Sequence, residues 1–281
     1  MKLKAYAKIN LSLDITGKRD DGYHDISSVM QSVTLCDEVE VLKNERGTIS
    51  ISSDSAEIPN NEENIAYKAA KLMIDTFNLC CGFDIFIKKN IPVAGGMAGG
   101  STNAAAVIKA INEICKLGLT TDELMKIGVK VGADVPFCIY QKPALAEGIG
   151  EKITAISGLS DDLWILLVNP NEKVSTKKIY EKIDNEVLYN KTDNEKLACA
   201  LKNNDINTAK KYMINVMQDV SQKECGKIAE IIKKIDNLGA IHSMMSGSGA
   251  TCFGIFNEKP DLIKAKKLFD GFFVSAVKAV N

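Results

Sequence analysis

The sequence is poor in the residue patterns that build metal centres and disulfide frameworks. It has only two histidines in 281 residues, and its eight cysteines include no C-x-x-C pair. In a chain of this length, that pattern argues against a zinc site and against a disulfide framework. We therefore expect a protein of the reducing cytoplasm that has no dedicated metal ligands.

An excess of one charge and long apolar runs are also missing. The formal net charge is −1, which gives no basic surface for nucleic acid. No apolar run approaches the ~20 residues that a membrane span needs. Lys8, Asn10 and Asp14 interrupt the first apolar stretch, so we expect no signal peptide. These absences predict that neither nucleic acid nor a membrane is a partner.

Glycine, by contrast, is concentrated in one stretch, residues 92–102. The stretch joins a candidate strand, FDIFIKKNI, to apolar residues at helical spacing. Glycines permit positive φ and close backbone approach, and a helix N-terminus attracts phosphate. A tight turn capped by Ser101 or Thr102 is the alternative. The candidate phosphate-binding residues are Pro92, Val93, Ala94, Gly95, Gly96, Met97, Ala98, Gly99, Gly100, Ser101 and Thr102.

Neither common nucleotide motif fits this loop. Ser101 stands where the Walker pattern has lysine, and G-x-G-x-x-G cannot be placed. The loop resembles the ATP loop of the GHMP kinases, P-x-x-x-G-L-G-G-G-S-S. That resemblance implies ATP and Mg²⁺ as cofactors, with the metal carried by ATP and contacted by Ser101 or Thr102. Ala98 replaces a family glycine, so we expect its φ to stay negative or the loop to relax slightly.

Two further segments carry candidate site residues. LKAYAKINLSLDI alternates as a half-buried strand does, which places Lys8 and Asn10 on one side. On spacing alone, Lys8 is a solvated strand lysine. Tyr23 and His24 follow a turn, and standing alone they indicate a core or interface aromatic and a surface histidine.

A-K-x-N followed by R-x-D-G-Y-H resembles one branch of the GHMP kinases, which phosphorylates a cytidine-diphosphate-linked methylerythritol in the non-mevalonate isoprenoid pathway. The resemblance implies transfer from ATP to the 2-hydroxyl of that substrate. It also implies that Lys8 lies near the acceptor, that Asn10 lines the same pocket, and that Tyr23 and His24 hold the cytosine ring. Tyr180 corresponds to a second aromatic against cytosine, with core packing as the alternative.

GADVPFC contains the remaining candidate catalytic residue. Pro136 should push Val135 towards extended geometry and leave Asp134 at a constrained bend. In isolation Asp134 is an ordinary turn aspartate, whereas the resemblance implies the carboxylate that accepts the hydroxyl proton. The resemblance also implies that a second glycine turn, at Gly247, Ser248 and Gly249, closes beside the phosphates and the substrate.

The patterns predict short strands between Val29 and Ile58 and an amphipathic helix over residues 206–220. Strand and helix patterns together predict an α+β protein. The resemblance implies a two-domain GHMP kinase fold, with an N-terminal ribosomal-protein-S5-like ATP domain at 1–156 and a C-terminal α/β sandwich at 157–281. A monomer or a homodimer is expected. A homoserine or mevalonate-type kinase, a catalytically dead nucleotide-binding protein and a related decarboxylase remain alternatives. Helix caps are predicted at Asn64, Thr120 (with Glu123 in a capping box), Ser175, Asp205 and Ser221.

Overall fold

The computed structural model describes residues 1–184 and 191–281. These residues form two compact units whose segments alternate along the sequence. The first unit comprises Met1–Ala7, Leu35–Val93 and Ala98–Gln141; the second comprises Lys8–Thr34, Ala94–Met97 and Lys142–Asn281. The boundary expected after residue 156 stays a prediction.

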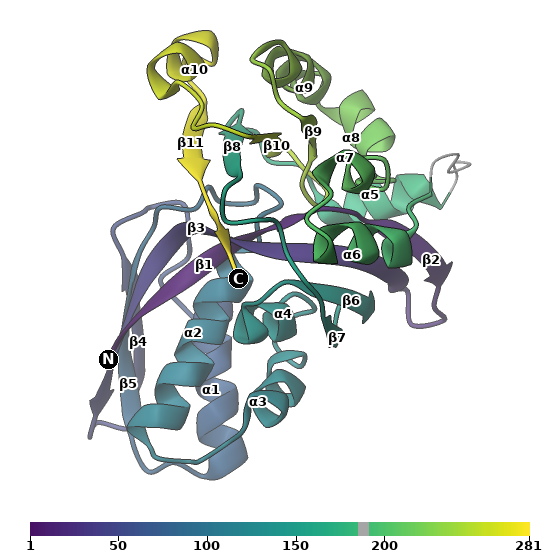
Figure 1. The fold of residues 1–281 in the computed structure, drawn as a ribbon. Coiled ribbons are helices and arrows are strands. Elements are labelled where there is room, and N and C mark those ends of the chain that lie inside the picture. The colour runs from purple at the N-terminus through teal and green to yellow at the C-terminus, as the bar shows by residue number, and fades with distance from the viewer. Residues whose placement is uncertain (185–190) are drawn as a thin grey trace. The chain divides into compact units, whose positions relative to one another are not determined.

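The first unit is a sheet covered by helices. Strand β5 pairs with β4 in parallel. It also pairs in antiparallel register with the second half of β3 (His24–Asn44). Helices α1 and α2 lie side by side and bury their alanine-rich faces in the same core (Figure 1). The complete elements of this unit are β4 (Ile49–Ser53), α1 (Ile65–Phe77), β5 (Gly82–Lys88), α2 (Gly99–Ile114), α3 (Thr121–Gly128) and α4 (Val135–Tyr140).

The second unit contains two groups of strands. The first half of β3 pairs with β2, β6 and β12, and β6 continues into a hairpin with β7. Strands β11, β8, β10 and β9 form a separate antiparallel sheet in that order. The strands are β2 (Asp14–Lys18), β6 (Ala144–Gly148), β7 (Lys152–Ala155), β8 (Trp164–Asn169), β9 (His242–Met245), β10 (Cys252–Phe256), β11 (Phe273–Val277) and β12 (Ala279–Val280).

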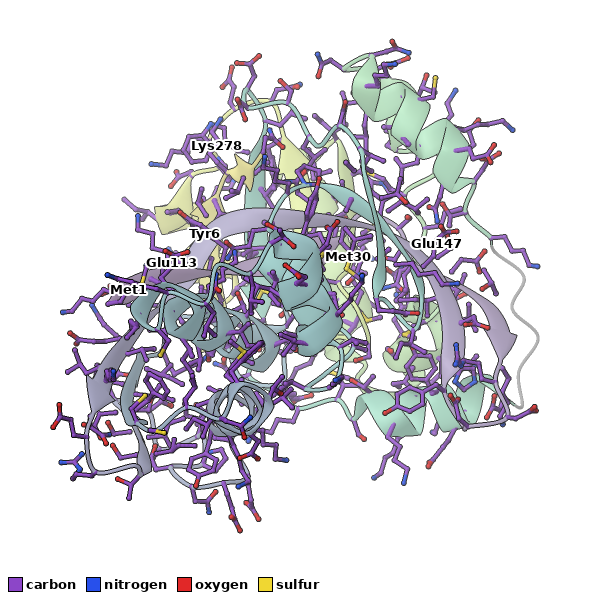
Figure 2. All side chains as sticks on the ribbon, turned by 90° about the horizontal axis from the view of Figure 1, so that it is seen from below. Met1, Tyr6, Met30, Glu113, Glu147 and Lys278 are labelled. Atoms are coloured by element: carbon purple, nitrogen blue, oxygen red, sulfur yellow. The ribbon has the colours of Figure 1, made fainter. Side chains whose placement is uncertain are left out.

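Helices complete the second unit. The strongly amphipathic α9 packs against β9 and β10, and α10 contacts β11. Met30 of β3 is buried, whereas Glu147 of β6 lies on the surface (both labelled in Figure 2). The helices are α5 (Thr176–Ile183), α6 (Asn194–Lys202), α7 (Ile206–Ala209), α8 (Gln218–Glu224), α9 (Lys227–Asn237) and α10 (Leu262–Leu268). The α+β prediction is confirmed.

Two expected elements differ from the structure. The short strands expected between Val29 and Ile58 are instead one 21-residue strand, β3 (His24–Asn44), followed by β4. The amphipathic helix expected over residues 206–220 is broken into α7 and the start of α8. In the part of the chain that the structure describes, none of the helices combines the length and apolar character that crossing a bilayer requires.

Candidate active site

Lys8 and Asn10 lie near the end of β1 (Lys2–Asn10), inside the second unit. Lys8 Nζ donates to Asn10 Oδ1 at 2.7 Å, and Asn10 Nδ2 donates to Ser28 Oγ at 2.8 Å. Lys8 is 4% exposed and Asn10 1% exposed. A solvated strand lysine is therefore wrong for this position, because the side chain is buried and held by a polar network. Buried cations need such partners, since loss of hydration is otherwise costly.

Three consecutive carbonyls tie the middle of the glycine loop to the second unit. Thr251 N donates to Gly95 O at 3.2 Å, and Ser246 Oγ donates to Gly96 O at 3.1 Å. Lys8 N donates to Met97 O at 3.2 Å. The next residue in the chain, Ala98, belongs to the first unit.

Gly96 is required where the loop meets Ser246. Its φ is +77°, and a Cβ built there would stand 2.3 Å from Ser246 O. That separation is impossible for a side chain, and L-residues also resist this φ.

The second glycine turn, predicted at residues 247–249, is held by hydrogen bonds from other segments of the second unit. Asn215 Nδ2 donates to Gly247 O at 2.8 Å and to Met245 O at 2.9 Å. Ser248 O accepts from Ser221 Oγ at 3.0 Å, while its hydroxyl lies 2.8 Å from Thr176 Oγ1. Gly247 and Gly249 take positive φ of +58° and +89°. The turn is thus held in one shape by three helical or loop segments of its own unit.

The end of the glycine loop belongs to the first unit and opens α2. Ala98 is the N-cap residue and has a φ of +55°. Of the two alternatives expected for Ala98, a negative φ is wrong: the alanine adopts the left-handed conformation, which glycine takes without a Cβ clash. Gly99, Gly100, Ser101 and Thr102 form the first turn of the helix. Thr102 N already donates to Ala98 O at 2.9 Å, whereas the N–H groups before it have no acceptor within the helix.

Thr102 carries the second indication of a ligand at this turn. The residue is fully buried, and among residues 1–184 and 191–281 its Oγ1 finds no hydrogen-bond partner. A buried hydroxyl without a partner is uncommon in folded proteins. A helix N-terminus, flexible glycines and a spare hydroxyl suit a phosphate with its bound metal ion. Within the described residues, no group of three or more His, Cys, Asp or Glu side chains could hold a metal ion.

A buried aspartate fixes the segment that leads into the loop. Asp37 is 0% exposed and accepts from Asn90 N at 2.7 Å and from Ile91 N at 2.9 Å. Asn103 Nδ2 also donates to it, at 2.8 Å, and Lys89 forms an ion pair with it. One carboxylate therefore joins β3, the residues before Pro92 and the first turns of α2.

Asp134 stands at the start of α4 in the first unit. It is half-buried, and its backbone is helical, with φ −81° and ψ −11°. Extended geometry at Val135 is therefore wrong: Val135 begins α4, and Pro136 occupies the first turn, where its missing N–H is not needed. Lys8 belongs to the other unit, so the convergence of Lys8 and Asp134 stays a prediction.

Aromatic and charged side chains gather around His24 in the second unit. The rings of His24 and Tyr180 stack at 4.7 Å with an interplanar angle of 18°. Asp184 lies 2.6 Å from Lys18 Nζ and 2.8 Å from His24 Nε2, and these two neighbours, Lys18 foremost, lower its pKa. An ionised carboxylate only accepts, so Nε2 of His24 is the donor. Tyr23 is 57% exposed.

The sequence of this chain is similar to that of known kinases over nearly its full length. Over 270 residues the chain is 46% identical to a protein of Clostridioides difficile (strain 630) named 4-diphosphocytidyl-2-C-methyl-D-erythritol kinase, covering 95% of this chain and 90% of the relative. Residues 64–142 match the model of the GHMP kinases N terminal domain, and residues 197–269 match that of the GHMP kinases C terminal. The chain belongs to the GHMP kinase family.

Other GHMP kinases agree with this assignment. A protein of the same printed name from Clostridium novyi (strain NT) is 44% identical over 97% of this chain and 95% of its own. A solved 4-(cytidine 5'-diphospho)-2C-methyl-D-erythritol kinase matches with a TM-score of 0.79 at 24% identity, covering 99% of both chains. Homoserine kinase from Cytophaga hutchinsonii matches with a TM-score of 0.77 at 18% identity, covering 100% of this chain and 95% of that one. The family resemblance predicted from the motifs is confirmed.

Several residues around this GHMP kinase loop escaped the sequence analysis. Asp37, Lys89 and Asn103 form the polar cluster before the loop. In the second unit, Ser28 accepts a hydrogen bond from Asn10, and Asn215 donates one to Gly247 O. None of them stands in a recognisable local pattern. Ser246 could have been suspected from the sequence, because it directly precedes the second glycine turn. In the structure its hydroxyl donates to Gly96 O of the first glycine loop.

Proposed function

We propose that this chain transfers the γ-phosphoryl group of ATP to the 2-hydroxyl of 4-diphosphocytidyl-2-C-methyl-D-erythritol. The observation that carries the proposal is the near-full-length match to curated kinases of that name, together with the lysine and asparagine buried beside the glycine loop. The reaction would take place in the cytoplasm, on two small-molecule substrates, with the protein a monomer or a homodimer.

The glycine loop would hold the ATP phosphates. Phosphoryl transfer asks the protein mainly for positioning and for neutralisation of charge on the transferred group. The N–H groups that open α2 supply the first part of that neutralisation. Mg²⁺ arriving with ATP would add positive charge at the phosphates. Ser101 and Thr102 would contact it through their hydroxyls, and the Oγ1 of Thr102 has no hydrogen-bond partner among the described residues.

Lys8 and Asp134 would act on the acceptor hydroxyl. Asp134 would orient the hydroxyl and take its proton as the bond to phosphorus forms. Lys8, held by Asn10, would stabilise the negative charge that develops on the acceptor and the phosphoryl oxygens. The Gly247–Gly249 turn, bonded through Ser246 to Gly96, would close beside the phosphates.

The cytosine end of the substrate would lie against Tyr23, His24 and Tyr180. A tyrosine ring offers a face for a pyrimidine, and ring stacking adds to the area that is buried. His24 Nε2 faces Asp184, which leaves Nδ1 as the ring nitrogen available for a polar contact with the edge of cytosine.

The deciding experiment is an acceptor panel with coupled detection of ADP. We expect turnover of the cytidylated methylerythritol, and little with the same sugar phosphate lacking cytidine, with homoserine or with mevalonate. Preference for homoserine or mevalonate would replace the proposed substrate while keeping the kinase. Carbon dioxide release from mevalonate diphosphate would indicate a decarboxylase instead.

The role of Asp134 has its own test. Asp134→Asn keeps the shape of the side chain and removes the proton acceptor, so kcat should fall by about a hundred-fold or more. ATP binding, followed by calorimetry, should change little. Turnover at the rate of the unaltered protein would remove Asp134 from the mechanism.

A further inference from the structure

A buried serine lies behind the lysine and asparagine pair of the second unit. Ser28, in β3, is 0% exposed. Its hydroxyl donates to Ser12 O at 2.6 Å and accepts from Asn10 Nδ2 at 2.8 Å. Asn10 Oδ1 in turn accepts from Lys8 Nζ at 2.7 Å. The four groups form one chain of hydrogen bonds that runs from a backbone carbonyl to the ammonium group.

The chain of hydrogen bonds has only one workable direction. A carbonyl can only accept, so the single proton of the Ser28 hydroxyl must point at Ser12 O. The hydroxyl oxygen then offers Asn10 an acceptor and no donor. The amide must therefore turn its NH₂ to Ser28 and its oxygen to Lys8, because the reverse orientation would set an NH₂ group against an ammonium group.

We propose that Ser28 is a positioning residue for phosphoryl transfer, which acts by fixing the Asn10 amide and through it the location of the Lys8 ammonium group. The proposal rests on the proposed function, in which Lys8 stabilises the charge that develops during transfer. A lysine has four flexible carbons, and displacement of a reacting or stabilising group by ~1 Å can cost a hundred-fold in rate. Ser28 touches no substrate in this role.

The surrounding backbone should tolerate loss of the Ser28 hydroxyl. Leu11 N donates to Val29 O at 2.8 Å, and Val29 N donates to Ser12 Oγ at 3.0 Å. These bonds join the segment after β1 to β3 at the residue next to Ser28, and they do not use the Ser28 side chain. Ser28→Ala should therefore fold, and its effect should fall on the orientation of Asn10.

The first measurement compares three variants by steady-state kinetics. Ser28→Ala should lower kcat about ten-fold or more while KM for ATP stays within about two-fold. Ser28→Thr keeps a hydroxyl on a strand-compatible side chain and should restore most of kcat. Ser32→Ala, a buried serine on the same strand and at the same alternation, is the matched control and should behave as the unaltered protein.

The second measurement is a double-mutant cycle with Lys8→Ala, by single-turnover kinetics. If Ser28 acts through the lysine, Ser28→Ala should lower the rate no further once Lys8 is gone. Multiplicative losses in the double variant would overturn the proposal. So would a Ser28→Ala protein with a lower urea midpoint and an unchanged kcat, or a Lys8→Ala protein with full turnover.

Failure of the proposed function would look different. It would appear in the unaltered protein as absence of turnover with the cytidylated methylerythritol. The same cycle, measured with whichever acceptor the panel identifies, would still test the coupling between Ser28 and Lys8.

Discussion

Two lysines of the first unit lie against partners of different charge. Lys89 pairs with the carboxylate of Asp37. Lys109 donates to the neutral amide oxygen of Gln141 at 2.9 Å, and burial lowers its pKa to about 8. A neutral amide compensates for the lost hydration of an ammonium group less well than a carboxylate does. Of these two lysines, Lys109, which is half-buried, is therefore the one whose charge should cost stability near neutral pH.

That cost should depend on pH. Because the pKa of Lys109 is about 8 in the folded chain against 10.5 in the reference state, the unfolded chain binds the proton more tightly. The penalty is complete below about pH 8 and is relieved as pH rises towards 10.5. Lys109→Met should raise the free energy of unfolding at pH 7 by on the order of 1 kcal/mol, and the gain should shrink by pH 10.

Urea denaturation followed by circular dichroism at both pH values measures this difference. The exposed Lys126 of α3 offers the control, since Lys126→Met should shift stability equally little at each pH. A gain for Lys109→Met that stays constant across the range would contradict the assignment.

At the scale of elements, the junction between the glycine loop and α2 contains strained alanines. Ala98 has a φ of +55° and Ala94 a φ of +56°. The left-handed conformation costs a residue with a Cβ about 1–2 kcal/mol, a cost that glycine avoids. This strain lies in the glycine loop that we propose holds the ATP phosphates, where a close approach of the backbone to the ligand would matter most.

Ala98→Gly should relieve part of that strain. Glycine also gains entropy in the unfolded chain, which offsets the benefit by about 0.4–1 kcal/mol, so the free energy of unfolding should rise by roughly 0.5–1 kcal/mol. Ala106→Gly, inside α2 with ordinary helical geometry, should instead lose about 1 kcal/mol or more. Equal losses in the two variants by urea denaturation would show that the φ of Ala98 carries no strain.

Local signals predicted helix starts well. Asn64, Ser175 and Asp205 each accept a bond from the first turn of their helix, and Thr120 with Glu123 forms the expected capping box. These caps were predictable because the acceptor and donor lie within three residues of each other. The cap expected at Ser221 is wrong: it lies inside α8, where its hydroxyl donates to Ser248 O.

Contacts between distant segments could not be predicted in the same way. The burial of Lys8 depends on partners that the alternation of β1 does not reveal, including Ser28 beyond Asn10. Asp37 looks like any strand aspartate until residues 89–91 and 103 gather around it. The motifs predicted the family and the two glycine loops. The polar contacts that support these loops join residues far apart in the sequence, so only the structure identifies them.

At the scale of the whole molecule, each compact unit is assembled from separate stretches of sequence. The second unit takes residues from both halves of the chain. Its β12 pairs with β3 through Ala279 with Val33 and Val280 with Ser32. The buried Gln31 side chain donates to Val280 O at 2.8 Å. These residues therefore contribute to the stability of segments that lie far from them in the sequence.

Removing residues 279–281 should test that contribution. The deletion leaves the Gln31 amide without this acceptor and also removes the bond from Asn281 Nδ2 to Leu159 O. Each lost bond is worth about 1 kcal/mol, so the melting temperature should fall by several degrees. Val280→Thr keeps the backbone pairing and should melt close to the unaltered protein. A deletion variant with an unchanged melting temperature would show that β12 adds nothing.

The pairing of β12 with β3 also bears on synthesis. A ribosome makes Val33 long before it makes Ala279. The β3 edge that β12 will cover must stay open while the intervening chain emerges, and an open strand edge invites pairing with other chains. Until β12 emerges, the nascent chain should therefore be open to pairing with other chains at Ser32 and Val33, and slow codons between the two strands should prolong that exposure.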